Sequence, residues 1–166
     1  MRKQKWFMLV TIVLVALFAV GCSWGQKTKL GEVGGKKDDE AAIKEVVEAY
    51  YAKLKNFEWE SFDKEAGLEF WTTEGRERYL AEEADSLAES VKKQKLSIQL
   101  KEIEFKEIKI EENKAAVNLV SQEQCSSEVT KDLNGAFQGY GQLELQKKEQ
   151  TWQIESSNFQ LIKFTS

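Results

Sequence analysis

Apolar residues recur along this chain at two different periods, and the change from one period to the other separates helices from strands. From Asp38 onward the apolar side chains recur at three- and four-residue spacing, which places them on one face of a helix. The positions concerned are Ile43, Val46, Val47, Tyr50, Tyr51 and Leu54. Three acidic residues, Asp38, Asp39 and Glu40, precede this stripe, where the positive end of a helix dipole favours them. The pattern therefore predicts a helix that begins at Asp38.

A second helical pattern follows an irregular aromatic segment. Residues 56–67 carry aromatic side chains without a regular period and are expected to form a short helix or turn against the first helix. Thr72 or Thr73 then offers an N-cap for one helix that runs to Lys95. Its apolar face comprises Leu80, Ala84, Leu87 and Val91.

After Lys95 the period falls to two, which indicates strands. Apolar residues alternate from Leu96 to Leu100, then continue on the opposite parity at Ile103 and Phe105, and change parity again at Ile108. A parity change within a strand predicts a bulge or a bend. Turns are expected at "EENK" (111–114) and "KKEQ" (147–150), which gives about four to five antiparallel strands. Helices followed by strands define an α+β fold, with N-terminal helices packed on a curved antiparallel sheet.

The first 21 residues have the pattern of a secretory signal. Met1–Lys5 carries three basic side chains, and Trp6–Gly21 carries no charge. As a helix the uncharged segment would span about 24 Å, less than the roughly 30 Å hydrocarbon core, so cleavage is favoured over a permanent span. An uncleaved anchor and an ordinary secretory cut nearby are the two alternatives.

The sequence Phe18-Ala19-Val20-Gly21-Cys22 resembles the lipobox of bacterial lipoproteins, with Ala19 where leucine is more usual. The resemblance implies that Cys22 receives a diacylglycerol thioether and becomes the first mature residue. Two acyl chains suffice for stable anchoring. The expected organisation is a signal peptide over 1–21, a flexible tether over 22–37 and a folded domain over 38–166, held at the extracytoplasmic face of the cell membrane.

Composition narrows the classes of partner. Removing the three basic residues of 1–21 from the total of 24 leaves 21 bases against 28 acids, a net charge of −7. Nucleic acid is therefore not an expected partner. The chain has no histidine, and Cys125 is the only cysteine besides Cys22, so no disulfide is expected within the mature chain. No metal or other cofactor is expected either, because Asp38, Asp39 and Glu40 lack the spacing of a calcium loop.

Three segments carry a further resemblance. The helix end "AYYAKLKNFEWESF", the segment "EFWTTEGRERYL" and the closing "ELQKKEQTWQIESSNF" resemble the NTF2-like cone fold, in particular its small lipoprotein members. Cystatin-like domains are the main alternative. The resemblance implies a cone whose mouth lies between the first helix and the concave face of the sheet.

The resemblance leaves the function open between several classes. The leading expectation is a non-enzymatic binding or interaction domain whose partner is another envelope protein or a small apolar ligand. A carrier or an acid–base enzyme that uses the cone cavity, with a tyrosine as donor and Asp63 as base, is an alternative, as is a subunit of a secretion or conjugation apparatus. The candidate pocket residues, each of which core packing or solvation could also explain, are Tyr50, Tyr51, Trp59, Phe62, Asp63, Phe70 and Trp71.

Overall fold

The computed structural model describes the backbone of residues 30–163 and the side chains of residues 37–163. The sheet lies in the compact unit that begins at Gly34. The predicted signal peptide, Cys22 and residues 22–29 of the predicted tether lie outside the described residues. Among the helices from Leu30 onward, none is both long and apolar enough to cross a membrane.

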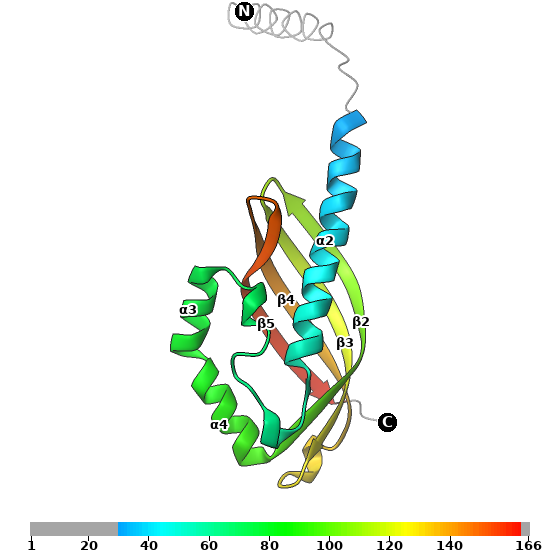
Figure 1. Cartoon of the computed structure of the whole chain (residues 1–166). Helices are drawn as coiled ribbons and strands as arrows, with labels where there is room; N and C mark the ends of the chain where they lie inside the picture. The colour runs from blue at the N-terminus through cyan, green and yellow to red at the C-terminus, as the bar shows by residue number, and fades with distance from the viewer. Residues whose placement is uncertain (1–29, 164–166) are drawn as a thin grey trace, which may run out of the picture. The chain divides into compact units, whose positions relative to one another are not determined.

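The fold is α+β, as the order of the sequence patterns predicts. Its sheet has five antiparallel strands in the order β1-β2-β3-β4-β5, so that each strand pairs with its neighbour in sequence. The sheet is curled, and α2 runs along its concave face (Figure 1). The strands are β1 (Asn56–Phe57), β2 (Leu96–Glu111), β3 (Lys114–Ser127), β4 (Gly135–Lys148) and β5 (Thr151–Lys163).

The parity changes in β2 are bulges, as predicted. The register between β2 and β3 shifts between Leu100 and Glu102 and again between Phe105 and Glu107. Each bulge adds one residue to β2, which increases the local twist and bends the strand. The predicted turns are also confirmed, with Glu112 (φ 53°) and Glu149 (φ 58°) in the left-handed conformation that tight hairpins require.

The first helix is longer than the sequence pattern predicts. α2 spans Leu30–Leu54, so the prediction that it begins at Asp38 is wrong, and the part of the expected tether from Leu30 to Lys37 is helical. Extending a helix by further turns costs much less than starting one, and the chain has no proline to stop the extension. The interpretation of the three acidic residues as dipole partners at the helix start is therefore also wrong.

One of these acidic residues anchors the helix to the sheet instead. The Asp39 carboxylate accepts hydrogen bonds from Lys147 Nζ (2.5 Å) and from Trp152 Nε1 (3.0 Å). These two donors hold the pKa of Asp39 below its usual value. Lys147 and Trp152 flank the β4–β5 hairpin, so this contact fixes the position of α2 along the sheet.

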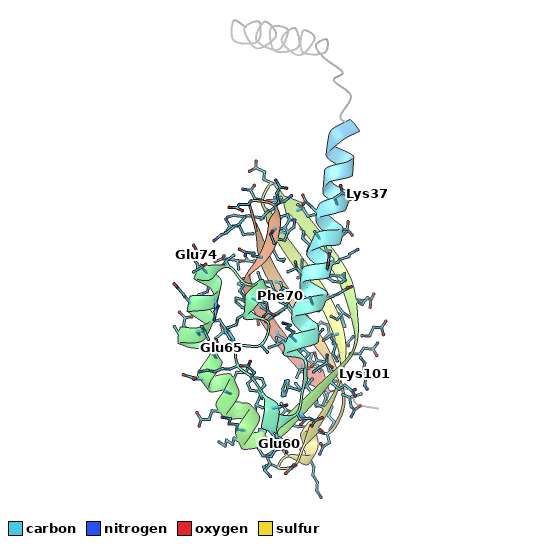
Figure 2. The ribbon with its side chains drawn as sticks, in the orientation of Figure 1. Lys37, Glu60, Glu65, Phe70, Glu74 and Lys101 are labelled. Carbon is cyan, nitrogen blue, oxygen red and sulfur yellow. The ribbon has the colours of Figure 1, made fainter. Side chains whose placement is uncertain are left out.

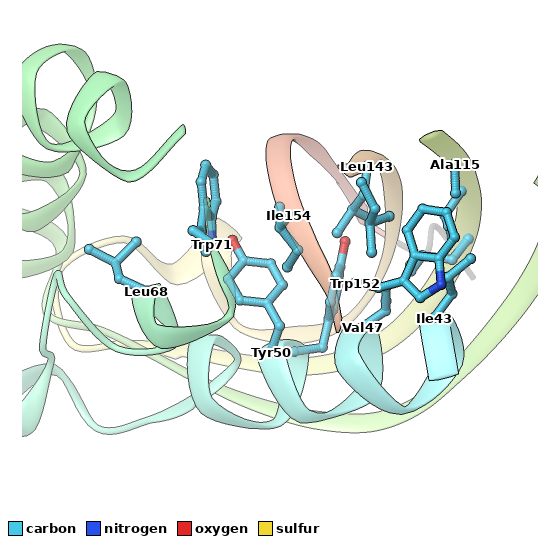
Figure 3. Packing of buried hydrophobic residues seen from close by; sticks show 13 residues of the cluster. Ile43, Val47, Tyr50, Leu68, Trp71, Ala115, Leu143, Trp152 and Ile154 are labelled. Carbon is cyan, nitrogen blue, oxygen red and sulfur yellow. The ribbon is translucent and has the colours of Figure 1, made fainter. Parts of the chain in front are cut away.

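The core lies between α2 and the concave face of the sheet (Figure 3). Ile43, Val47 and Tyr51 on α2 are at most 1% exposed. The sheet contributes inward-facing residues from β3, β4 and β5, which alternate with exposed ones as a half-buried sheet requires. These residues are Ala115, Val117, Leu119, Leu143, Leu145, Trp152 and Ile154. Charged side chains such as Glu74 and Lys101 lie at the periphery (Figure 2).

The aromatic segment after α2 contains no α-helix. It forms β1 and two single 3₁₀ turns, Trp59–Ser61 (η1) and Leu68–Phe70 (η2). Gly67 takes a left-handed conformation (φ 83°) just before η2, and a Cβ there would lie 2.8 Å from the Tyr50 ring. A single turn of 3₁₀ helix in this segment agrees with the expected short helix or turn.

The single helix predicted from Thr72 to Lys95 is two helices. α3 (Thr73–Glu82) and α4 (Ala84–Gln94) are separated at Glu83, whose φ of −123° is not helical. α3 contacts β5 whereas α4 contacts β2, and the break allows one segment to reach both strands. The predicted N-cap is confirmed, because the Thr72 hydroxyl accepts a hydrogen bond from the Gly75 N–H (3.0 Å).

Candidate functional site

A half-open cavity of about 760 Å³ lies beside the C-terminal end of α2. Its wall comes from that helix end, β1, α3, α4 and the ends of β2 and β5. The volume falls within the usual range of small-molecule sites, roughly 300–1,000 Å³, and such sites are mostly apolar with few polar groups. The apolar and aromatic wall residues are Tyr50, Leu54, Phe57, Phe62, Trp71, Tyr79, Leu87, Val91, Leu96, Ile98, Phe159 and Leu161.

The polar groups of the wall are few and differ in exposure. They are Lys55, Glu82, Glu83, Ser86, Ser90, Ser157 and Asn158. Glu82 and Glu83 are exposed, whereas Lys55 is only 7% exposed. Lys55 is therefore the one charged wall residue that the fold buries.

The end of α2 fixes the position of Lys55. Its N–H donates to the Tyr51 carbonyl (2.8 Å), and its carbonyl accepts from the Leu100 N–H of β2 (2.9 Å). Asn56 caps the helix end, because its Nδ2 donates to the Ala52 carbonyl (2.9 Å) and its Oδ1 accepts from the Leu100 N–H (3.1 Å). The backbone of Lys55 is thus held between a helix end and a strand.

The Lys55 ammonium lies over an aromatic ring and has no anion beside it. Its Nζ is 3.2 Å from the centre of the Phe159 ring, a cation–π contact. Within residues 37–163, no side chain or carbonyl forms a hydrogen bond or an ion pair with this ammonium. Burial lowers the pKa of Lys55 to about 8, against the opposing effect of the Glu123 charge. The side chain is therefore mostly protonated at neutral pH.

A buried polar cluster on the concave face of the sheet lies close enough to influence this charge. Glu123 on β3 is 1% exposed, and its Oε1 accepts a hydrogen bond from Ser121 Oγ (2.8 Å). Its Oε2 has no hydrogen-bond partner among the described residues, nor has the hydroxyl of Tyr51. Burial and the Glu123 charge raise the pKa of the Cys125 thiol to about 11. Cys125 is therefore protonated and unreactive at neutral pH, in keeping with a structural role.

Gly141 on β4 makes room for Tyr51 in this cluster. A Cβ at Gly141 would lie 2.1 Å from the Tyr51 hydroxyl oxygen. The missing side chain lets the Tyr51 ring, which is 1% exposed, lie directly against the strand. Burial raises the pKa of Tyr51, so its hydroxyl stays neutral.

Of the seven candidate pocket residues, the structure brings three to the cavity wall: Tyr50, Phe62 and Trp71. Tyr50 and Trp71 pack edge to face, with ring centres 5.9 Å apart. Tyr79, which the sequence analysis does not single out, lies next to Trp71, with ring centres 5.5 Å apart. A continuous aromatic surface thus forms one side of the cavity.

The other four candidates lie outside the wall. Tyr51 belongs to the core, and Phe70 packs at the edge of the core with Lys53 Nζ 5.7 Å from its ring centre. Trp59 donates from Nε1 to Glu128 (3.2 Å). Asp63 is exposed and accepts a hydrogen bond from the Glu65 N–H (2.9 Å), a local turn contact.

Sequence reasoning missed Lys55, although a signal was present. Lys55 follows Tyr51 by four positions and therefore continues the apolar stripe of α2 with a charged residue. Phe159 and Ser157 were missed for a different reason, because a register shift at Glu155 changes which residues of β5 face the wall.

Two comparisons with known proteins return nothing. No protein-family model matches this chain, and no curated protein matches it. Within residues 37–163, no group of three or more acidic, cysteine or histidine side chains could hold a metal ion.

Proposed function

We propose that this protein is a lipid-anchored binding protein that holds a small, largely apolar ligand outside the membrane. The cavity beside the C-terminal end of α2 carries the proposal, since it is of ligand size and its wall is mostly apolar and aromatic. The anchor is inferred from the lipobox resemblance around Cys22. We further propose that the domain is NTF2-like, which the long helix against a curled antiparallel sheet supports.

Binding without turnover is better supported than acid–base catalysis in the same cavity. The base considered for catalysis, Asp63, is exposed and lies outside the wall. The two tyrosines considered as donors are buried, and burial raises the pKa of both. An interaction domain for another envelope protein is a second candidate, favoured by the exposed side chains of Tyr140 and Ile162, which line a shallow hollow on β4 and β5.

The lipid anchor predicts that Cys22→Ser abolishes acylation. Cells that express the wild-type chain and are fed radiolabelled palmitate are expected to incorporate label into this protein, and the Cys22→Ser variant none. Cys125→Ser is the matched control, since it removes the only other cysteine and should keep the label. An unlabelled wild-type protein, or label lost only in the control, would overturn the proposed anchor.

The proposed cavity site predicts saturable binding of a neutral apolar probe. The mature full-length protein, in discs of zwitterionic phospholipid, is incubated with photoreactive dodecanol and illuminated. Labelling is expected to saturate with probe concentration and to map to peptides that contain Tyr50–Phe62 and Ser157–Leu161, because both segments line the cavity. Labelling that rises linearly, or that maps to other segments, contradicts a cavity site.

A further inference from the structure

Lys55 is a buried cation that the fold places at the wall of a ligand-sized cavity. Its side chain is 7% exposed, and the Phe159 ring is its only close electrostatic contact in the wall. An aromatic face attracts the charge but accepts no ordinary hydrogen bond, so the three N–H donors of the ammonium stay unpaired within the described residues. Burying an unpaired ammonium in this way costs folding free energy, and pairing with an anion offsets that cost.

Two other polar atoms of the wall also lack a hydrogen-bond partner of good geometry. Trp71 Nε1 and the Tyr79 hydroxyl are buried and have no hydrogen-bond partner among the described residues. Both side chains line the same cavity as Lys55. The buried polar groups of the wall thus offer hydrogen-bond donors and one positive charge.

The acidic groups nearby do not neutralise this wall. Glu123 raises the pKa of Lys55 from the β3 side, but it does not line the cavity and forms no ion pair with Lys55. Glu82 and Glu83 line the cavity but are exposed, so solvent screens their charges. A ligand anion would therefore meet one buried positive charge and no buried negative charge in the wall.

We infer that the ligand is an amphipathic molecule with an apolar chain or ring system and a single carboxylate, which pairs with the Lys55 ammonium. The inference rests on the proposed function, because it assigns the ligand class of the same cavity. The apolar part lies against the aromatic surface of Tyr50, Trp71 and Tyr79, and the carboxylate accepts hydrogen bonds from Lys55. A hydrogen bond between charged groups in a buried site discriminates more strongly than one between neutral groups.

The test compares an acid with the alcohol of the same chain length. Photoreactive dodecanoic acid and photoreactive dodecanol are titrated against the mature full-length protein in discs of zwitterionic phospholipid, and labelling is quantified by intact mass. For the wild-type protein, labelling by both probes is expected to saturate, with the acid reaching half-saturation at the lower concentration. Lys55→Met is expected to raise the half-saturating concentration of the acid about tenfold or more and that of the alcohol less than about twofold.

Lys53→Met is the matched control. Lys53 lies two residues earlier, in the last turn of α2, is exposed, pairs with Glu69 and does not line the cavity. Lys53→Met also removes one positive charge, but at a position outside the cavity. It should therefore leave the half-saturating concentrations of both probes unchanged.

The outcomes separate the two proposals. Saturable labelling by both probes, with Lys55→Met leaving the acid unaffected, would overturn the carboxylate inference and leave the binding function standing. Labelling that saturates with neither probe would overturn the binding function itself. An equal loss of acid labelling in Lys53→Met would show a general charge effect and would also overturn the role of Lys55.

Discussion

Replacing Lys55 with methionine is expected to stabilise the ligand-free protein by about 3 kcal/mol at pH 7. The pKa of Lys55 falls from a usual value of 10.5 to about 8 in the folded state, so folding disfavours the charged form. Below pH 8 the folded protein bears the full cost of a buried ammonium, which methionine removes while preserving most of the side-chain volume. Because the lowered pKa already includes the attraction of Glu123, that attraction needs no separate correction.

The stability difference between Lys55→Met and the wild-type protein should decrease as the pH rises. Between pH 8 and 10.5 the unfolded wild-type chain binds more protons at Lys55 than the folded chain, so wild-type stability rises with pH relative to the variant. The advantage of Lys55→Met should therefore shrink by about 2 kcal/mol between pH 7 and pH 9.5. Guanidinium unfolding of both proteins, followed by tryptophan fluorescence, measures the difference at each pH.

Taking the difference between the two proteins cancels most of the other titrations. Tyr50, Tyr51 and Tyr79 have raised pKa values, but Lys55 contributes to none of these shifts and all three residues are present in both proteins. If Lys55→Met destabilised the protein, or if its advantage did not change with pH, the ammonium would not be buried in the folded protein.

Replacing Trp152 with alanine is expected to lower the free energy of unfolding by about 3–5 kcal/mol. Trp152 is 2% exposed in the core, and its Nε1 donates to the Asp39 carboxylate of α2 (3.0 Å). The substitution leaves a cavity under α2 and removes one of the two donors that hold Asp39. Because Lys147 still pairs with Asp39, most of the loss comes from packing.

Trp59→Ala provides the matched comparison for the same unfolding measurement. Trp59 is only half-buried, and its Nε1 bonds to the exposed Glu128 side chain. Trp59→Ala should lower the free energy of unfolding by about 1 kcal/mol, in the range of ordinary point substitutions. Equal losses for the two variants would mean that the Trp152 contact does not hold α2 against the sheet.

Much of the fold could be read from the spacing of apolar residues. The stripe from Ile43 to Leu54 identifies the face of α2 that is buried, and the parity changes after Leu100 and Phe105 locate both bulges. These features are local, because helix and strand periods of 3.6 and 2 residues are set by backbone geometry alone. Thr72 was likewise identifiable as an N-cap from its position before a helical pattern.

Contacts distant in sequence explain the errors in the α3–α4 segment and at Asp63, whereas the early start of α2 reflects the low cost of extending a helix. The glycines before Asp38 suggested a flexible segment, yet α2 begins at Leu30. The stripe from Leu80 to Val91 suggested one helix, yet α3 contacts β5 and α4 contacts β2, which requires the break at Glu83. Asp63 was a candidate base only through the resemblance to the NTF2-like fold, and its position in a solvent-exposed turn depends on how the segment folds.

The sequence by itself determined the α+β class, the face of α2 that is buried and the two hairpin turns, because each follows from short-range periodicity or a contiguous motif; the lipid anchor at Cys22 stays a prediction from the same kind of motif. Only the tertiary structure decided that Lys55, at the end of a helix, lies over Phe159 from the last strand and within the influence of Glu123. Such an arrangement depends on how the sheet curls around α2. A buried charge at a ligand-sized cavity thus arises from chain segments about 100 residues apart, whose proximity no local pattern encodes.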